Sequence, residues 1–102
     1  MDITIGDLNA LDEIRIQTWN SEYYFLVTEP VLCKGILTGG IFGEEQHVAI
    51  FTGTIIREPL QIQGGTKLEV GECAMFCVAI EQRMRRLKTS KIVDLSLTSS
   101  GN

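Results

Sequence analysis

The residues most able to do chemistry are three cysteines, Cys33, Cys73 and Cys77, and a single histidine, His47. Thiolates and imidazoles bind zinc, and a thiolate beside a histidine can act as a nucleophile. Two sulfurs that share a zinc ion lie less than ~4 Å apart, because each lies ~2.3 Å from the metal. Cys73 and Cys77 would be about 13 Å apart on a strand but one turn apart on a helix. A strand therefore forbids a shared metal, and we expect no metal site, no catalytic residue and no cofactor.

An odd number of cysteines, with no visible secretory signal, argues against a disulfide framework. We expect three reduced thiols that are buried as small apolar side chains. His47 follows Glu44, Glu45 and Gln46, which predicts a solvated loop histidine. A Cys–His enzyme is the weakest of three functional hypotheses, because a thiol must meet His47 in space and a third group must orient the base.

Two other patterns could suggest a ligand site. Residues 39–43 (Gly-Gly-Ile-Phe-Gly) are glycine-rich, but Glu44 and Glu45 follow them. A phosphate cradle needs a helix N-terminus after the glycines, and two carboxylates would repel phosphate. The segment therefore predicts a loop. The pairs Glu44–Glu45 and Asp12–Glu13 are expected to be solvated surface charge.

The most informative feature is a run of basic residues within 83–91. It holds five of the nine basic residues with no acid between them, namely Arg83, Arg85, Arg86, Lys88 and Lys91. At a hairpin tip these cations would form a positive patch on an acidic body. Such a patch could bind an acidic protein, an anionic polymer or a neighbouring copy of the chain. The alternative is a polar turn that only keeps the hairpin soluble.

Nucleic acid is a possible but disfavoured partner, because the formal net charge of the chain is −4. If Trp19, Tyr23 and Tyr24 lay near the basic run, their rings could stack on the bases of RNA or single-stranded DNA. A nucleic-acid-binding barrel that uses residues 83–91 is therefore the alternative functional hypothesis.

Length and composition indicate one globular domain over residues 1–102, with a lead-in at 1–12 and a frayed tail at 98–102. The chain is 44% hydrophobic and 22% charged. No apolar run approaches the ~20 residues of a membrane span. The first residues lack the basic and apolar regions of a signal peptide, so we expect a cytoplasmic location and no membrane partner.

Apolar side chains recur at every second position, which predicts strands. Ile14 and Ile16 alternate with polar residues, and residues 22–28 follow a turn, so the two segments predict a first hairpin. Further strands are expected at 31–38, 47–56, around Leu60 and Ile62, at 73–82 and at 87–97. Gly53 predicts a bulge or sharp bend, and Pro59 an irregular connection. Together these segments predict six or seven antiparallel strands in a small barrel or sandwich.

Residues 73–87 have two interpretations. As a helix they present an apolar stripe at spacings of three and four. As a strand they have two apolar faces, one of which consists of Cys73, Met75, Cys77 and Ala79. We favour a hairpin, because the surrounding elements are strands that would otherwise lack a closing partner. The second apolar face then predicts an oligomer surface at Cys73, Met75 and Cys77.

Three segments carry a resemblance: Glu13–Val27, Leu37–Gly40 and Leu87–Val93. The chain resembles a family of short uncharacterised bacterial proteins over most of its length. The resemblance implies a small β-barrel domain without an assigned activity. The Thr89-Ser90-Lys91-Ile92 element is also similar to the last strand of the β-barrel domain in translation elongation factors, which implies a fold and no functional residue.

From these observations we expect a protein that binds without catalysis. The leading hypothesis is a small binding or assembly module whose partner is another protein or a second copy of the chain. The nucleic-acid-binding barrel is the alternative, and the Cys–His enzyme is the third hypothesis.

Overall fold

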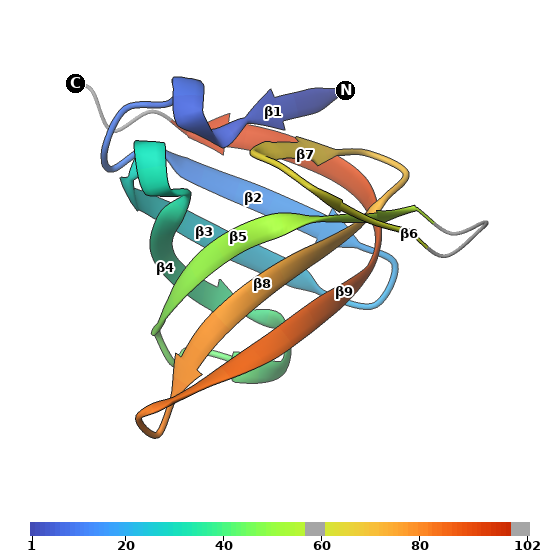
Figure 1. Cartoon of the computed structure of the whole chain (residues 1–102). Helices are drawn as coiled ribbons and strands as arrows, with labels where there is room; N and C mark the ends of the chain where they lie inside the picture. The colour runs from blue at the N-terminus through green and yellow to red at the C-terminus, as the bar shows by residue number, and fades with distance from the viewer. Residues whose placement is uncertain (57–60, 99–102) are drawn as a thin grey trace.

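The computed structural model describes residues 1–56 and 61–98 (Figure 1). These ranges contain nine strands and three short 3-10 helices. In chain order they are β1 (Asp2–Thr4), η1 (Ile5–Asp7), β2 (Glu13–Thr18), β3 (Glu22–Glu29), η2 (Pro30–Leu32), β4 (Lys34–Gly39), η3 (Gly40–Phe42), β5 (His47–Ile56), β6 (Gln61–Gly64), β7 (Lys67–Glu69), β8 (Cys73–Ile80) and β9 (Arg83–Thr98). The predictions made for Pro59, Leu60 and the tail at 99–102 lie outside the described residues.

Six of these strands form a closed antiparallel barrel in the order β2, β3, β4, β5, β8 and β9, and β9 pairs with β2 to close the ring. Apart from this closing pair and the insertion of β6 and β7 between β5 and β8, neighbours in the barrel are also neighbours in the sequence. The predicted all-β barrel is therefore confirmed. The alternative helix over 73–87 is wrong, because β8 and β9 form an antiparallel hairpin there.

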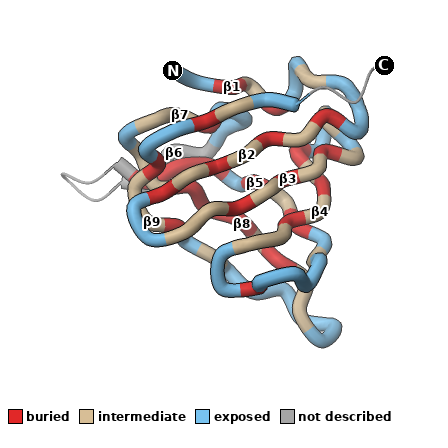
Figure 2. Tube along the Cα trace, turned by 180° about the vertical axis from the view of Figure 1, so that it is seen from behind, coloured by how far each residue is buried: buried red, intermediate tan, exposed pale blue. Residues whose placement is uncertain are grey.

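The core lies inside the barrel and follows the period-two pattern of the sequence. Along β2 and β3 buried and half-buried residues alternate, and Ile14 and Ile16 face inward as predicted (Figure 2). Three phenylalanines meet at the centre. The ring centroid of Phe76 lies 5.2 Å from that of Phe25 and 5.5 Å from that of Phe51, both edge-on. Burial of each ring stabilises the fold by roughly 2–3 kcal/mol.

A second sheet of two strands, β1 and β7, covers the end of the barrel opposite the β8–β9 turn (Figure 1). Ile3, Ile5 and Leu68 pack from this sheet and η1 against the barrel core. The N–H of Ile5 donates to the carbonyl of Thr66 at 2.7 Å. The segment predicted as a lead-in thus contributes a strand, a 3-10 turn and two core isoleucines.

The ends and bends of the strands follow from local backbone chemistry. The bulge predicted at Gly53 is confirmed, because the register between β5 and β8 shifts at this residue, whose φ is 143°. The third barrel strand begins later than predicted. Pro30 starts η2, the left-handed Cys33 (φ 52°) ends it, and β4 begins only at Lys34. Proline at the first helical position is favoured, because its φ is already helical.

Gly35 marks a close approach between the backbones of β4 and β3. A Cβ at this position would overlap the backbone carbonyl oxygen of Leu26 and would lie 3.1 Å from Cε1 of Phe25. The register of β3 against β4 shifts beside it, between Val27 and Glu29. A glycine is thus required where the sheet turns a corner and brings two backbones together.

We therefore expect Gly35→Ala to lower the free energy of unfolding by about 3 kcal/mol, because the overlapping atom belongs to backbone that cannot turn aside. Gly6→Ala is the matched control, since a Cβ on Gly6 would meet nothing within 4 Å. It should change stability by less than about 0.5 kcal/mol. Urea denaturation of both variants measures the difference, and equal midpoints would contradict the close approach at Gly35.

Candidate functional site

The hairpin formed by β8 and β9 extends beyond the rest of the barrel, away from β1 and β7 (Figure 1). Ile80 pairs with Arg83 across a two-residue turn. Glu81 and Gln82 both have positive φ, 50° and 65°, which is the geometry of a type I′ turn. β5 pairs with β8 only as far as Val78, so the tip has no third strand beside it. Residues 81–86 are all exposed.

One backbone edge of this hairpin is open. In the strand ladders residues 83–91 of β9 pair with β8 and residues 92–98 pair with β2, and Ile92 also exchanges backbone hydrogen bonds with Gly71 and Glu72, just before β8. Within the described residues, no strand hydrogen-bonds to the other edge of β9 between Arg83 and Ser90. This stretch of β9 is therefore an edge strand on an otherwise closed barrel.

Four cations of the predicted patch lie on this open stretch of β9, and the fifth, Lys91, follows at its end. Arg83, Arg85, Arg86 and Lys88 are exposed and Lys91 is half-buried. In the part of the chain that the structure describes, none of the five forms an ion pair. The three described cations elsewhere all do, with Arg15 bound to Glu22, Lys34 to Glu29 and Lys67 to Asp2.

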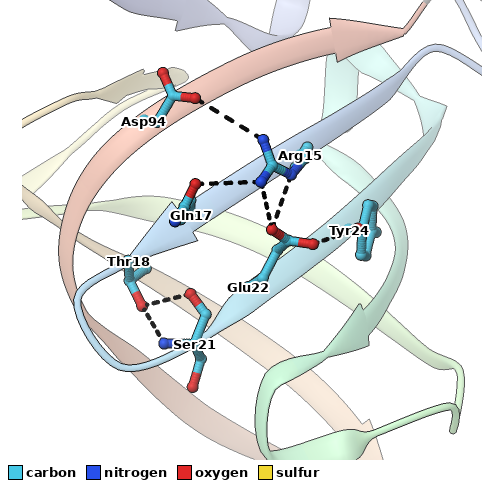
Figure 3. A network of polar contacts seen from close by, with 7 residues as sticks. All are labelled: Arg15, Gln17, Thr18, Ser21, Glu22, Tyr24 and Asp94. Carbon is cyan, nitrogen blue, oxygen red and sulfur yellow. Dashed lines mark hydrogen bonds and ion pairs between the residues drawn. The ribbon is translucent and has the colours of Figure 1, made fainter.

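The contrast is clearest at Arg15, on the outer face of β2 (Figure 3). Its Nε and Nη2 donate to Glu22 Oε2 at 2.9 and 2.6 Å, and Nη2 also donates to Gln17 Oε1 at 3.2 Å. The Tyr24 hydroxyl donates to the other oxygen of Glu22, and Asp94 lies 3.9 Å from Nη1. This network ties β3, β2 and β9 together and leaves little of the arginine charge uncompensated.

Hydrogen bonds shift the pKa values inside this network. The hydrogen bond from Arg15 lowers the pKa of Glu22 below its ordinary value, and the hydrogen bond from Tyr24 adds to the effect. The same contacts raise the pKa of Arg15 and of Tyr24. The network therefore holds its charges across the physiological range as a cross-strand contact, whereas the cations of β9 have no such partner.

A bulge determines where the cations at the base of the hairpin point. Met75 pairs with Lys88 and Cys73 with Lys91, so one residue of β8 faces two residues of β9. Lys88 and Lys91 are three positions apart and would face opposite sides of a regular strand. The extra residue brings both onto the outer face, while Thr89 turns inward and binds the N–H of Ala74 at 3.0 Å.

Lys88 and Lys91 line a surface hollow of about 220 Å³ together with Trp19, Cys73, Thr89 and Ser90. Trp19, in the β2–β3 turn, is 68% exposed. Lys91 Nζ lies 5.5 Å from the centroid of its ring, which is within cation–π range. The backbone N–H of Trp19 donates to the carbonyl of Lys91 at 3.1 Å, so the β2–β3 turn is fixed to β9.

The predicted oligomer face lies on the outer side of β8. Cys73 and Cys77 are half-buried and Met75 is 9% exposed. Met75 and Cys77 line a second hollow of about 220 Å³ with Thr52 and Arg86. The outward direction of these three side chains agrees with the strand interpretation, and a cation stands among them.

The cysteines and His47 are not brought together. Cys33 is buried, and burial raises the pKa of its thiol. Cys73 and Cys77 are four residues apart on one strand, about 13 Å. The described residues contain no group of three or more histidine, cysteine or acidic side chains that could hold a metal ion.

The prediction of a solvated loop histidine is wrong. His47 begins β5, and its side chain is 17% exposed. The ring lies 4.7 Å from that of Phe42, Nδ1 is 3.2 Å from the carbonyl of Ala79, and Nε2 is 3.2 Å from Glu45. The C-terminal end of β8, at Ala79, therefore helps to cover the His47 side chain, although the sequence neighbours of His47 are polar.

Two further predictions need correction. Asp12 is 4% exposed rather than solvated, and its Oδ2 accepts the N–H of Asn9 at 2.9 Å. Tyr23 lies in the core and Tyr24 is bound to Glu22, so neither ring joins the basic run. Of the three aromatic side chains considered for base stacking, only Trp19 lies beside it. The glycine-rich segment forms the 3-10 turn η3, as expected of a connection.

Comparison of the chain with protein-family models, curated proteins and solved structures gives no match. Among the described residues, no helix is long and apolar enough to cross a membrane. The fold class is that of a closed six-stranded antiparallel barrel with a capped end and a protruding basic hairpin.

The Arg15 network predicts a pH-dependent contribution to stability. Because the pKa of Glu22 is lower in the folded chain than its ordinary value of 4.5, its stabilisation is complete above that pH and is lost as the pH falls below it. Glu22→Gln should therefore lower the melting temperature at pH 7, and the gap to the parent should narrow below pH 4.5. Thermal melts between pH 3 and 7 measure this.

Glu44→Gln is the control, because Glu44 is exposed and has no ion pair within the described residues. It should melt with the parent at every pH. A Glu22→Gln gap that stayed constant down to pH 3 would contradict an ionised Glu22 as the source of the stabilisation.

Proposed function

We propose that the protein is a non-catalytic binding module that docks an anionic partner on the β8–β9 hairpin. The observation that supports this most is the contrast in ion pairing. Every described cation outside the hairpin has a carboxylate partner, whereas the five on β9 have none within the described residues. A partner with negative charge would supply the missing counterparts.

The distribution of charge favours docking in one orientation. Residues 81–91 contain five basic residues and one acid, a net charge of +4, while the whole chain carries −4. The remainder of the chain therefore carries −8. Such a separation orients an approaching anion toward the hairpin and accelerates association at low salt. It also reconciles an acidic protein with an anionic partner.

A competing explanation is that the cations only protect an open strand edge. Lysine and arginine on edge strands prevent pairing with the edges of other molecules. This explanation requires positive charge along the edge but no affinity for anions. A binding measurement separates the two accounts.

The test uses inorganic polyphosphate and compares two double variants that each remove two positive charges. Arg85→Gln/Arg86→Gln removes hairpin cations, and Lys34→Gln/Lys67→Gln removes cations elsewhere. We expect the parent to bind at low salt, with affinity that falls steeply as salt rises. The hairpin variant should bind at least 10-fold more weakly, and the control within about 2-fold of the parent. Calorimetric titration gives the affinities.

The proposal falls if the parent does not bind polyphosphate at low salt, because the edge-protection account then suffices. It also falls if both double variants lose affinity equally, since the binding would then reflect total charge and not the hairpin.

Self-association is a second candidate, supported by apolar exposure on the same outer face. Val48 is 44% exposed and Met84 is 59% exposed, and they lie on the strands that flank Cys77. A two-fold pairing of this face about an axis through Cys77 would bring Arg86, the cross-strand partner of Cys77, near its own copy, which is repulsive. The geometry therefore favours a head-to-tail contact in which the cations meet the acidic body of the next copy.

Light scattering at micromolar concentration should then give a mass above the 11.3 kDa monomer, and this mass should fall with added salt. A monomer at low salt would exclude this candidate.

A further inference from the structure

We infer that the hollow at the base of the hairpin binds one nucleotide unit of a single-stranded nucleic acid, with Trp19 stacking on the base and Lys88 and Lys91 binding phosphate. The inference rests on the proposed function, because it names the chemical class of the anionic partner. The following features of the hollow carry it.

The first feature is an exposed aromatic platform. Trp19 is the only tryptophan of the chain and is 68% exposed, although indole is usually buried in small domains. The backbone on both sides of the platform is fixed to β9. The N–H of Trp19 donates to the carbonyl of Lys91, and the N–H of Asn20 donates to Ser90 Oγ at 3.1 Å. The indole is thus presented to solvent from a turn held at a defined position.

The second feature is the chemistry around the ring. Lys91 Nζ lies 5.5 Å from the ring centroid, and Lys88 lines the same hollow because of the bulge. Neither lysine forms an ion pair within the described residues. Ser90 Oγ accepts from Asn20, which leaves the hydroxyl proton of Ser90 free to donate to a phosphate oxygen. A ring, two ammonium groups and a hydroxyl match a base and its phosphate, whereas an acidic peptide would use only the ammonium groups.

The third feature is size. The hollow of about 220 Å³ is smaller than a site for a whole drug-sized ligand, which is typically 300 Å³ or more. It can hold one unit of a polymer that continues elsewhere. The second hollow, beside Arg86, continues along the outer face of the same strand toward the tip, while the exposed Arg83 and Arg85 lie on the other face of the hairpin. Proteins that bind single strands combine such a cationic track with stacking aromatics.

The experiment uses a twelve-residue oligothymidylate, with and without a fluorescein label, and unlabelled polyphosphate of matched charge and polyglutamate as competitors, all at low salt. Trp19 is itself a reporter, because stacking of a base should quench the fluorescence of the only indole. We expect the unlabelled oligonucleotide to quench Trp19 and to bind more tightly than polyphosphate or polyglutamate.

Three variants identify the contacts. Trp19→Ala should weaken oligonucleotide binding about 10-fold, because the base loses its stacking surface, and should leave polyphosphate affinity unchanged. Trp19→Phe should restore most of the loss. Lys88→Gln/Lys91→Gln should weaken both ligands. Ile41→Ala is the matched control, because Ile41 is 73% exposed on η3 and should change neither affinity. Circular dichroism checks that each variant is folded.

The possible failures are distinguishable. If polyphosphate binds but Trp19→Ala holds the oligonucleotide as tightly as the parent does, this inference is overturned and the proposed function stands. Tighter binding of polyglutamate than of the oligonucleotide would identify an acidic protein as the partner and would also overturn it. If no polyanion binds at low salt, the proposed function fails and the inference fails with it.

Discussion

The structure depends on the exchange of hydrogen-bonding partners along β9. The strand pairs with β8 up to Lys91 and with β2 from Ile92 onward, so one continuous strand both builds the hairpin and closes the barrel. Closure requires β9 to bend between its two partners, and register shifts on both sides of this point allow the bend. The inward residues of β9, Thr89, Ile92 and Leu95, are spaced by three because of these shifts. On a strand with strict period-two alternation, Thr89 and Ile92 would face opposite sides of the sheet, and only one of them would point into the core.

The same exchange assembles the candidate site. Where β9 leaves β8, the β2–β3 turn arrives, and its Trp19 N–H takes the carbonyl of Lys91. The bulge beside it turns Lys88 and Lys91 to one side of the sheet. The open edge of β9 follows from the same geometry, because β2 lies on the opposite side of β9 from β8 and pairs with it only from Ile92 onward. A feature that closes the fold thus also concentrates the uncompensated charge.

The extent to which the sequence predicts the structure differs between local and long-range features. Ile14 and Ile16 alternate with polar residues, and this local pattern was sufficient to predict β2 and an inward face. The bulge at Gly53 also follows from a local signal, a glycine inside a strand. His47 could not be placed, because the carbonyl of Ala79 that binds it lies 32 residues away. The meeting of Trp19 with Lys91 depends on barrel closure across 72 residues, and no local signal indicates it.

The type I′ turn at Glu81 and Gln82 has a consequence for the local stability of the hairpin tip. Both residues adopt left-handed backbone without being glycine, which costs conformational energy at the point where the hairpin has only two strands. We therefore expect opening of the ladder to begin at the tip and to stop at Lys91, whose carbonyl accepts the N–H of Trp19 from the β2–β3 turn. The backbone at Arg83 and Arg85 would then be more mobile than the backbone at Lys91, and its amide protons would exchange with solvent faster.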